Sequence, residues 1–231
     1  RGEMSSVNGI LLVTKDLDWT SHDVCNFVRR RFNISKVGHA GTLDPKATGV
    51  LVLLLGEFTK QAPSFVNCDK IYSGTLELGT VTASQDSEGD ILEKKEWSHV
   101  SDDDVRRVIQ SFKGEQKQIP PMVSAIKMKG KRLYKLARKG ITIDREPRDI
   151  VIYDITCDAV SLPHVDFTAH VSKGTYVRTI AHDIGQKLGT GAYLSRLCRL
   201  NVGPYSKDMC VTIDELKSIE NPMDIIKYVR S

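Results

Sequence analysis

The sequence has no apolar run near the length of about 20 residues that a membrane-spanning helix needs. Its longest apolar run, Val50–Leu55, has the length of a buried strand. The N-terminus also lacks the pattern of a secretory signal peptide. We therefore expect no membrane span and no membrane partner, and we expect a cytoplasmic location.

Cysteine is scarce, and its spacing is wide. The count of five is odd, and no CxxC pair occurs. This usage is typical of reduced thiols and argues against a disulfide framework or a zinc site. The six histidines form neither an HxxxH nor an HExxH pattern. We therefore expect no metal site and no cofactor.

The length of 231 residues suits one large domain with a sizeable core, and 40% hydrophobic and 27% charged residues are ordinary for a globular protein. No internal repeat or low-complexity stretch is present. We expect a single domain over residues 1–231. No exposed apolar stripe calls for a second copy, so a monomer is expected.

Positive charge is concentrated in one short segment. Residues 113–149 carry 11 Lys and Arg against 4 Asp and Glu, a net charge of +7 where the whole chain has +4. Such clustering is typical of a surface that binds nucleic acid or another polyanion. A solvated basic face is the alternative, and charge alone favours it slightly. The basic residues of the expected loop crossing are Lys127, Lys129, Lys131 and Arg132.

Apolar periodicity predicts strands and helices without a regular βαβ series. We therefore predict an α+β fold, with a mixed, mainly antiparallel sheet flanked by helices. The expected strands are 9–15, 50–55, 70–78, 150–155 and 165–171. The expected helices begin near Ser21 and Ser101 and cover 133–139, 175–188, 214–219 and 224–228.

The stretch GHAGTLDPKATGVL, residues 38–51, places a carboxylate just before the buried strand. Pro45 fixes its own φ and pushes Asp44 toward an extended conformation. A carboxylate aimed in this way suits a nucleophile or a general base. Asp-Pro is also a common turn opener, and the stretch by itself favours the turn.

Two further stretches carry polar side chains with possible chemistry. Tyr176 and Arg178 lie two residues apart at the start of an expected helix, so both can face one site. Arginine beside a carboxylate keeps it ionised, and tyrosine can stack on a base. Tyr72 begins another strand. A surface arginine, a half-buried tyrosine and a core-edge tyrosine are the simpler interpretations.

Six ordered blocks resemble the bacterial-type tRNA pseudouridine-55 synthases, the B-type branch of the pseudouridine synthases. They extend over roughly residues 9–203. The most specific is HAGTLDP, which this branch shares with its guide-RNA relatives. The blocks are GILLVTK, GHAGTLDPKATGVLVLLLGEFTK, KIYSGTLELGTVTASQDSEGD, PPMVSAIKMKGKRLYKLARKG, VSKGTYVRTIAHDIGQKLG and LSRLCRLNVG.

The resemblance implies the pseudouridine-synthase fold, and it implies isomerisation of uridine 55 in the T-loop of tRNA without a cofactor. It assigns Asp44 as the catalytic aspartate, Tyr72 as the tyrosine that stacks on the base and a candidate proton acceptor, and Arg178 as the partner of the aspartate. The basic segment 113–149 would clamp the T stem-loop. The remaining residues that match the family's binding site are His39, Lys15, Tyr176 and Leu197.

The sequence departs from the family pattern in two places. Lys15 is followed by Asp16-Leu17-Asp18 where the family usually has proline and then glycine, which puts the course of this loop in doubt. About 28 residues follow Gly203, too few for the C-terminal PUA domain that many members carry. We therefore expect no PUA domain, and we expect the clamp to supply more of the affinity.

Two other functions remain open at the level of sequence. A non-catalytic tRNA-binding protein or folding chaperone on the same scaffold would not require Asp44, Tyr72 and Arg178 together. An aspartate-nucleophile hydrolase would need a second carboxylate beside Asp44 and usually magnesium, and Pro45-Lys46 supplies neither. The sequence does not choose between attack of Asp44 at C1′ of the ribose and attack at C6 of the uracil.

Overall fold

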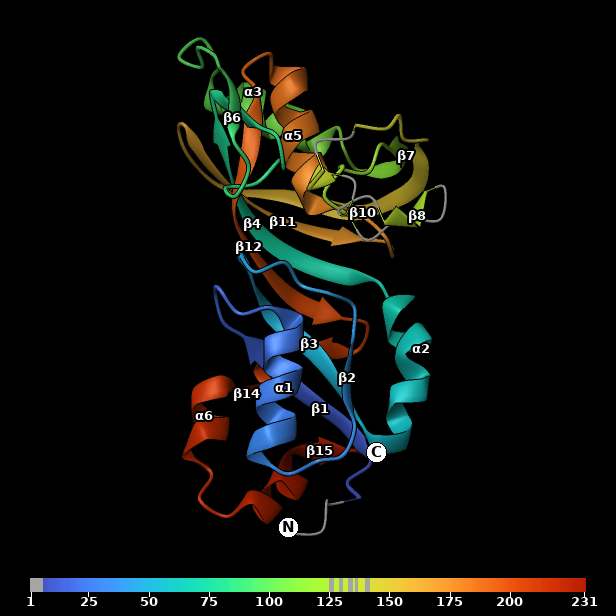
Figure 1. The fold of residues 1–231 in the computed structure, drawn as a ribbon. Helices are drawn as coiled ribbons and strands as arrows, with labels where there is room; N and C mark the ends of the chain where they lie inside the picture. Colours follow the sequence, from blue (N-terminus) through green and yellow to red (C-terminus); the bar gives the residue numbers. More distant parts are fainter. Residues whose placement is uncertain (1–5, 125–126, 129–130, 133–134, 136, 140–141) are drawn as a thin grey trace. The chain divides into compact units, whose positions relative to one another are not determined.

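The computed structural model describes residues 6–124, 127–128, 131–132, 135, 137–139 and 142–231 (Figure 1). The chain divides into two compact units, residues 1–72 with 197–231 and residues 73–196. Strands β4 (Lys70–Leu78) and β12 (Ala192–Val202) contribute residues to both units. The expectation of one domain over residues 1–231 stays a prediction.

The first unit is built on β1 (Gly9–Lys15) and β3 (Ala47–Leu55), which pair antiparallel along the whole length of β1. Strand β2 (Val37–Ala40) lies antiparallel to β3, and β12 lies parallel to it from Leu197. The short strands that complete this sheet are β13 (Tyr205–Ser206), β14 (Val211–Thr212) and β15 (Val229–Arg230).

Helices cover both faces of β1 and β3, which explains why β3 is a continuous apolar run rather than an alternating one. Figure 1 shows α1 (Ser21–Arg31) in front of these strands, and α6 (Ile213–Ser218) belongs to the same core. On the other face, Ile10 and Val52 pack with Phe65 of α2 (Ala62–Val66). The 3-10 helices are η1 (Gly56–Gln61), η2 (Lys207–Met209) and η3 (Pro222–Tyr228).

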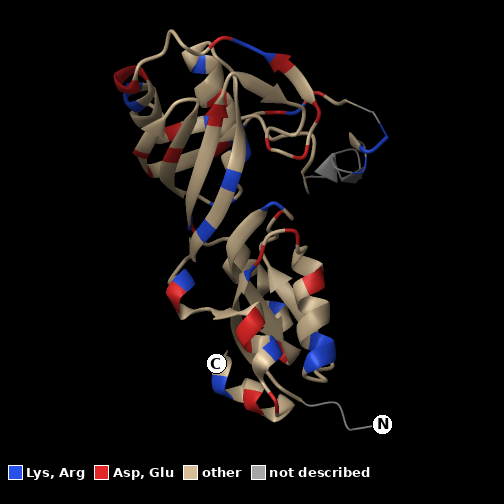
Figure 2. Ribbon diagram, turned by 90° about the vertical axis from the view of Figure 1, so that its left-hand side faces the viewer, with Lys and Arg blue, Asp and Glu red and all other residues tan. Residues whose placement is uncertain are grey.

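Helix α1 is capped at its start and positively charged at its end. The Thr20 hydroxyl accepts from the Asp23 N–H at 2.9 Å, and the Asp23 carboxylate accepts from the Thr20 N–H at 2.9 Å, which forms a capping box. Arg29, Arg30 and Arg31 occupy the last turn, where cations complement the helix dipole (Figure 2).

The second unit contains β11 (His164–Val171), β10 (Arg148–Ser161) and β7 (Gly114–Gln118), paired antiparallel in that order beside β4. In β11 the buried residues alternate with exposed or half-buried ones, as expected for a strand with one face on a core. The helices of this unit are α3 (Asp102–Gln110) and α5 (Val177–Leu188). Two hairpins pair β5 (Thr80–Thr82) with β6 (Ile91–Lys94) and β8 (Lys127–Met128) with β9 (Lys131–Arg132).

The predicted α+β class with a mainly antiparallel sheet is confirmed, and the strands at 9–15 and 70–78 have the predicted bounds. The helix expected at 175 begins at Val177, because Tyr176 is held in an extended conformation as its N-cap. The strand at 192–202 was missed, since its burial pattern does not alternate cleanly. Of the helix expected at 133–139, residues 133, 134 and 136 lie outside the described residues.

No helix in the part of the chain that the structure describes is both long enough and apolar enough to cross a membrane.

Candidate functional site

The loop that carries Asp44 forms a turn, and hydrogen bonds hold its backbone in place. The Ala47 N–H donates to the Asp44 carbonyl at 2.9 Å, which closes the turn at Pro45. One residue earlier, the buried Ser21 hydroxyl donates to the Leu43 carbonyl at 3.1 Å and accepts from the Leu43 N–H at 2.9 Å. The first residue of α1 therefore fixes the backbone beside Asp44, and the turn that the sequence favours here is present. The role of the Asp44 carboxylate stays a prediction.

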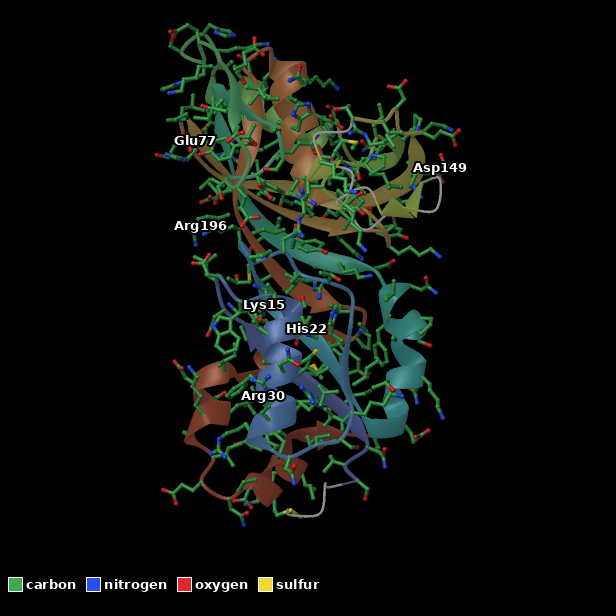
Figure 3. All side chains as sticks on the ribbon, in the orientation of Figure 1. Lys15, His22, Arg30, Glu77, Asp149 and Arg196 are labelled. Atoms are coloured by element: carbon green, nitrogen blue, oxygen red, sulfur yellow. The ribbon has the colours of Figure 1, made fainter. Side chains whose placement is uncertain are left out.

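Lys15, at the end of β1, lies beneath this loop and is fully buried. Its Nζ donates to the Trp19 carbonyl at 2.6 Å, the Asp16 carbonyl at 2.9 Å and the Pro45 carbonyl at 3.3 Å. Burial lowers the pKa of Lys15 to about 8, although the negative charge of Asp44 acts to raise it. Figure 3 labels Lys15 near the start of α1.

The unusual Asp16–Asp18 loop is tied to the same turn. The Asp18 N–H donates to the Pro45 carbonyl at 2.8 Å, and the Asp18 carboxylate pairs with Lys46 at 2.6 Å. Asp18 adopts a φ of +65°, a conformation that aspartate reaches more readily than most residues. The loop that departs from the family pattern is therefore bonded to the Asp44 turn, through the Pro45 carbonyl and the Lys46 side chain.

His39, on β2, is half-buried, and its Nδ1 is a buried atom without a hydrogen-bond partner. Burial lowers the pKa of His39, and the positive charge of Arg199 and the nearby His22 lower it further. His22 lies on the exposed side of the first turn of α1 (Figure 3). The imidazole of His39 is therefore held toward its neutral form.

The first unit holds two more of the predicted site residues. Leu197 pairs with Ala47 at the start of β3, and its carbonyl accepts from the Thr48 hydroxyl at 3.4 Å. Tyr72 lies on β4 and is 9% exposed. Lys15, His39, Asp44, Tyr72 and Leu197 thus belong to one unit, and Tyr176 and Arg178 belong to the other.

Arg178, the second residue of α5, is buried, and its partners are oxygen atoms. Its guanidinium donates to the Ser84 carbonyl at 3.1 Å and the Val123 carbonyl at 2.8 Å, and Nη1 lies 3.9 Å from the Asp86 carboxylate. The Tyr176 ring lies 5.8 Å from the guanidinium carbon. The sequence analysis did not identify Asp86 as a neighbour of Arg178.

Gln118 fixes the backbone just before Arg178, and sequence reasoning missed it. Its buried amide donates to the Tyr176 carbonyl at 3.0 Å and accepts from the Tyr176 N–H at 2.8 Å. This pair reproduces the reciprocal bonding of neighbouring strands and prevents Tyr176 from joining the helix. Because Gln118 and Val123 both lie in the basic segment 113–149, that segment is bonded to the start of α5.

The four basic residues expected to bind RNA fall at the edge of what the structure describes. Lys127 lies on β8 opposite Arg132 on β9, and Lys131 is also on β9. Lys129 lies outside the described residues, as do the side chains of the other three. Among the described residues, no group of three or more His, Cys, Asp or Glu is placed to hold a metal ion.

Burial of the Lys15 ammonium predicts a specific pH dependence of stability. The pKa of about 8 in the folded protein lies below the ordinary 10.5 of the unfolded chain, so the unfolded chain binds more protons between these values. The free energy of unfolding should therefore gain a contribution from Lys15 as the pH rises through this window. Urea denaturation at about pH 7, 8.5 and 10 should show wild type gaining stability relative to Lys15→Met. The exposed Lys60→Met controls for loss of one positive charge, and a wild-type advantage that stays flat would contradict a buried cation.

Loss of the Gln118 amide should destabilise the second unit, because the half-buried Tyr176 N–H loses its acceptor and the Tyr176 carbonyl keeps only its bonds from the Thr179 and Ile180 N–H groups. We expect Gln118→Met to lower the free energy of unfolding by about 1–3 kcal/mol. Gln116→Met is the matched control on the same strand, since it removes one bond to the Phe112 carbonyl. Equal losses for the two variants, measured by chemical denaturation, would argue against the reciprocal pair.

Two family models match this chain. The model of the TruB family pseudouridylate synthase N-terminal domain matches residues 29–177, and that of the tRNA pseudouridylate synthase B C-terminal domain matches residues 178–224. The tRNA pseudouridine synthase B of Geobacter sulfurreducens is 44% identical over 213 residues, which cover 92% of this chain and 70% of the relative. That of Opitutus terrae is 44% identical over 216 residues, 94% of this chain and 90% of the relative.

Solved structures show the same fold. A chain in a Cbf5-Nop10-Gar1 complex superposes with a TM-score of 0.70 at 30% identity, covering 89% of this chain and 52% of that one. A chain in an H/ACA RNP bound to a substrate RNA containing 2'-deoxyuridine gives 0.67 at 27% identity, covering 89% and 51%. This chain therefore spans about half the length of those two. The matched family models, with relatives at 44% identity over most of this chain, show that it belongs to the TruB family of pseudouridylate synthases.

Proposed function

We propose that this pseudouridylate synthase converts uridine 55 in the T-loop of tRNA to pseudouridine, with Asp44 as the nucleophile. The observation that carries the proposal is that the backbone is fixed on both sides of Asp44. Ser21 of α1 bonds to Leu43, and Lys15 of β1 bonds to the Pro45 carbonyl. A carboxylate that only opened a turn would not need a buried hydroxyl and a buried ammonium on its two neighbours. The relatives named tRNA pseudouridine synthase B support tRNA as the substrate.

The reaction rearranges bonds within one nucleotide. The N1–C1′ glycosidic bond breaks, the uracil rotates while it remains bound, and a C5–C1′ bond forms. The proton on C5 then leaves to a base, and N1 gains a proton, so atoms balance and no oxidation occurs. Asp44 would attack either C1′ of the ribose or C6 of the uracil, and Tyr72 is the candidate base.

The target uridine must leave its stack before Asp44 can reach it, at a cost of a few kcal/mol. His39 would fill the space that the base leaves. Its neutral imidazole suits insertion between bases, since it carries no charge into an apolar stack. Tyr72 would stack on the flipped base, which is worth about 1–3 kcal/mol. Leu197 and Tyr176 would line the pocket.

Arg178 would keep Asp44 ionised, because a cation near a carboxylate favours its charged form. Asp86 and the Ser84 and Val123 carbonyls orient the guanidinium within its own unit. Lys15 would act indirectly, since its ammonium is buried against carbonyl oxygens beneath the loop. We propose that Asp44, Tyr72 and Arg178 act on the same uridine.

The basic segment 113–149 would hold the T stem-loop by its phosphates, with Lys127, Lys129, Lys131 and Arg132 as contacts. Phosphate contacts of this kind make binding strongly dependent on salt. Because Val123 accepts from Arg178 and Gln118 bonds to Tyr176, the segment that grips RNA is joined to the start of α5. Binding of RNA by the segment would therefore affect the position of Arg178, the residue proposed to keep Asp44 ionised.

Incubation of the protein with an unmodified tRNA transcript in EDTA tests the activity and its position together. We expect one carbodiimide-dependent primer-extension stop, at the T-loop uridine 55. A stop elsewhere would contradict the assigned position. Absence of any stop while the tRNA remains bound would favour the non-catalytic tRNA-binding or chaperone function.

Replacement of the proposed nucleophile tests its role separately from binding. Asp44→Asn should abolish formation of pseudouridine and leave the affinity for tRNA nearly unchanged, since the amide keeps the shape of the carboxylate and lacks its nucleophilic charge. Asp18→Asn is the matched control, because this exposed carboxylate braces the same turn and asparagine accepts its positive φ. An active Asp44→Asn protein would refute the assignment.

A further inference from the structure

A second buried cation lies against the Asp44 loop, and none of the functions above uses it. Arg199, on β12, is only 2% exposed. Burial of a charge costs several kcal/mol unless hydrogen bonds compensate for the lost water. Its Nε donates to the Val50 carbonyl at 2.9 Å, and its Nη2 donates to the Gly41 carbonyl at 3.0 Å.

These two carbonyls lie on opposite sides of Asp44 in the chain. Gly41 follows the last residue of β2 and precedes Asp44 by three residues, and Val50 lies six residues after Asp44 within β3. One guanidinium therefore joins the entry of the loop to its exit. The residues between the two bonds include the whole turn at Pro45.

The backbone of Arg199 is fixed to the same loop. It pairs with Gly49 in the parallel register of β12 and β3. Gly49 has a φ of +103°, and a Cβ there would lie 2.1 Å from the Arg199 carbonyl oxygen, so only glycine permits this approach. With its backbone held at Gly49, the Arg199 side chain spans a fixed distance to Gly41.

Arginine is suited to this task in a way that other long side chains are not. A planar guanidinium presents donors in a rigid fork, whereas lysine offers a single mobile nitrogen. Nε and Nη2 belong to one rigid plane, so bonds from them to the two carbonyls fix the two backbone segments relative to each other. A residue that only filled the core would not require two donors.

We infer that Arg199 is a positioning residue for the isomerisation, because its guanidinium clamps the two ends of the loop that carries Asp44. The inference rests on the proposed role of Asp44 as nucleophile. Arg199 itself, at 2% exposure, acts through the backbone of Gly41 and Val50, and it sets the direction of the Asp44 carboxylate. Reaction rates are sensitive to such placement, since a shift of about 1 Å can cost about 100-fold.

The test measures chemistry and binding separately in Arg199→Met and Arg199→Lys, with full-length tRNA transcript. The rate constant comes from single turnovers at saturating enzyme, and Kd comes from filter binding. We expect the rate to fall by about 100-fold in the Met variant and by about 10-fold in the Lys variant. The Kd for tRNA should change by less than about threefold. An unchanged rate in Arg199→Met, or a loss that resides only in Kd, would overturn the inference.

Arg31→Met controls for general destabilisation. Arg31 donates to the Ile219 carbonyl in the same unit, at the opposite end of α1 from the residue that fixes Leu43. This variant should lower the Tm and leave the single-turnover rate unchanged well below the Tm. An equal fall in rate for Arg31→Met would show that lost stability explains the effect. If Arg199→Met does not fold, Arg199→Lys against Arg31→Met keeps the comparison.

Failure of this inference differs from failure of the proposed function. Active wild type, inactive Asp44→Asn and fully active Arg199→Met would refute the positioning role and leave the function intact. Pseudouridine formation by Asp44→Asn would refute the role of the nucleophile whatever Arg199 does.

Discussion

Buried cations that donate to backbone carbonyls hold the loop on which the proposed chemistry depends. Lys15 reaches the Pro45 carbonyl from β1, and Arg199 reaches the Gly41 and Val50 carbonyls from β12. Hydrogen bonds to carbonyl oxygens compensate these cations for the water that they lose on burial. A short loop so held has little freedom to move in its backbone.

In the second unit, too, a buried cation donates hydrogen bonds to backbone carbonyls. Arg178 donates to the Ser84 and Val123 carbonyls and lies near Asp86, while the Gln118 amide fixes the backbone of Tyr176. A buried guanidinium with several oxygen partners keeps one orientation, because rotation would leave at least one of its donors unsatisfied. The bonds to Val123 and Tyr176 also join the basic segment to α5. The basic segment proposed to bind RNA and Arg178, the residue proposed to keep Asp44 ionised, thus belong to one hydrogen-bonded network.

Local sequence predicted the elements whose formation depends on neighbours in the chain. The strand at 70–78 and the apolar run of β3 could both be predicted, because each reflects a pattern of burial among residues that are close in sequence. The strand at 192–202 was missed, since its register depends on β3 and not on its own pattern.

The sequence by itself determined the fold class, the family and the residues that match its motifs, because ordered motif blocks and apolar periodicity survive without coordinates. Only the tertiary structure decided how those residues are held. Arg199, Gln118 and Asp86 each act on a backbone or side chain at least 30 residues away in sequence, and the partners of such contacts depend on which strands pair. Charge and spacing along the chain do not encode that pairing, so buried polar contacts were the part that sequence could not supply.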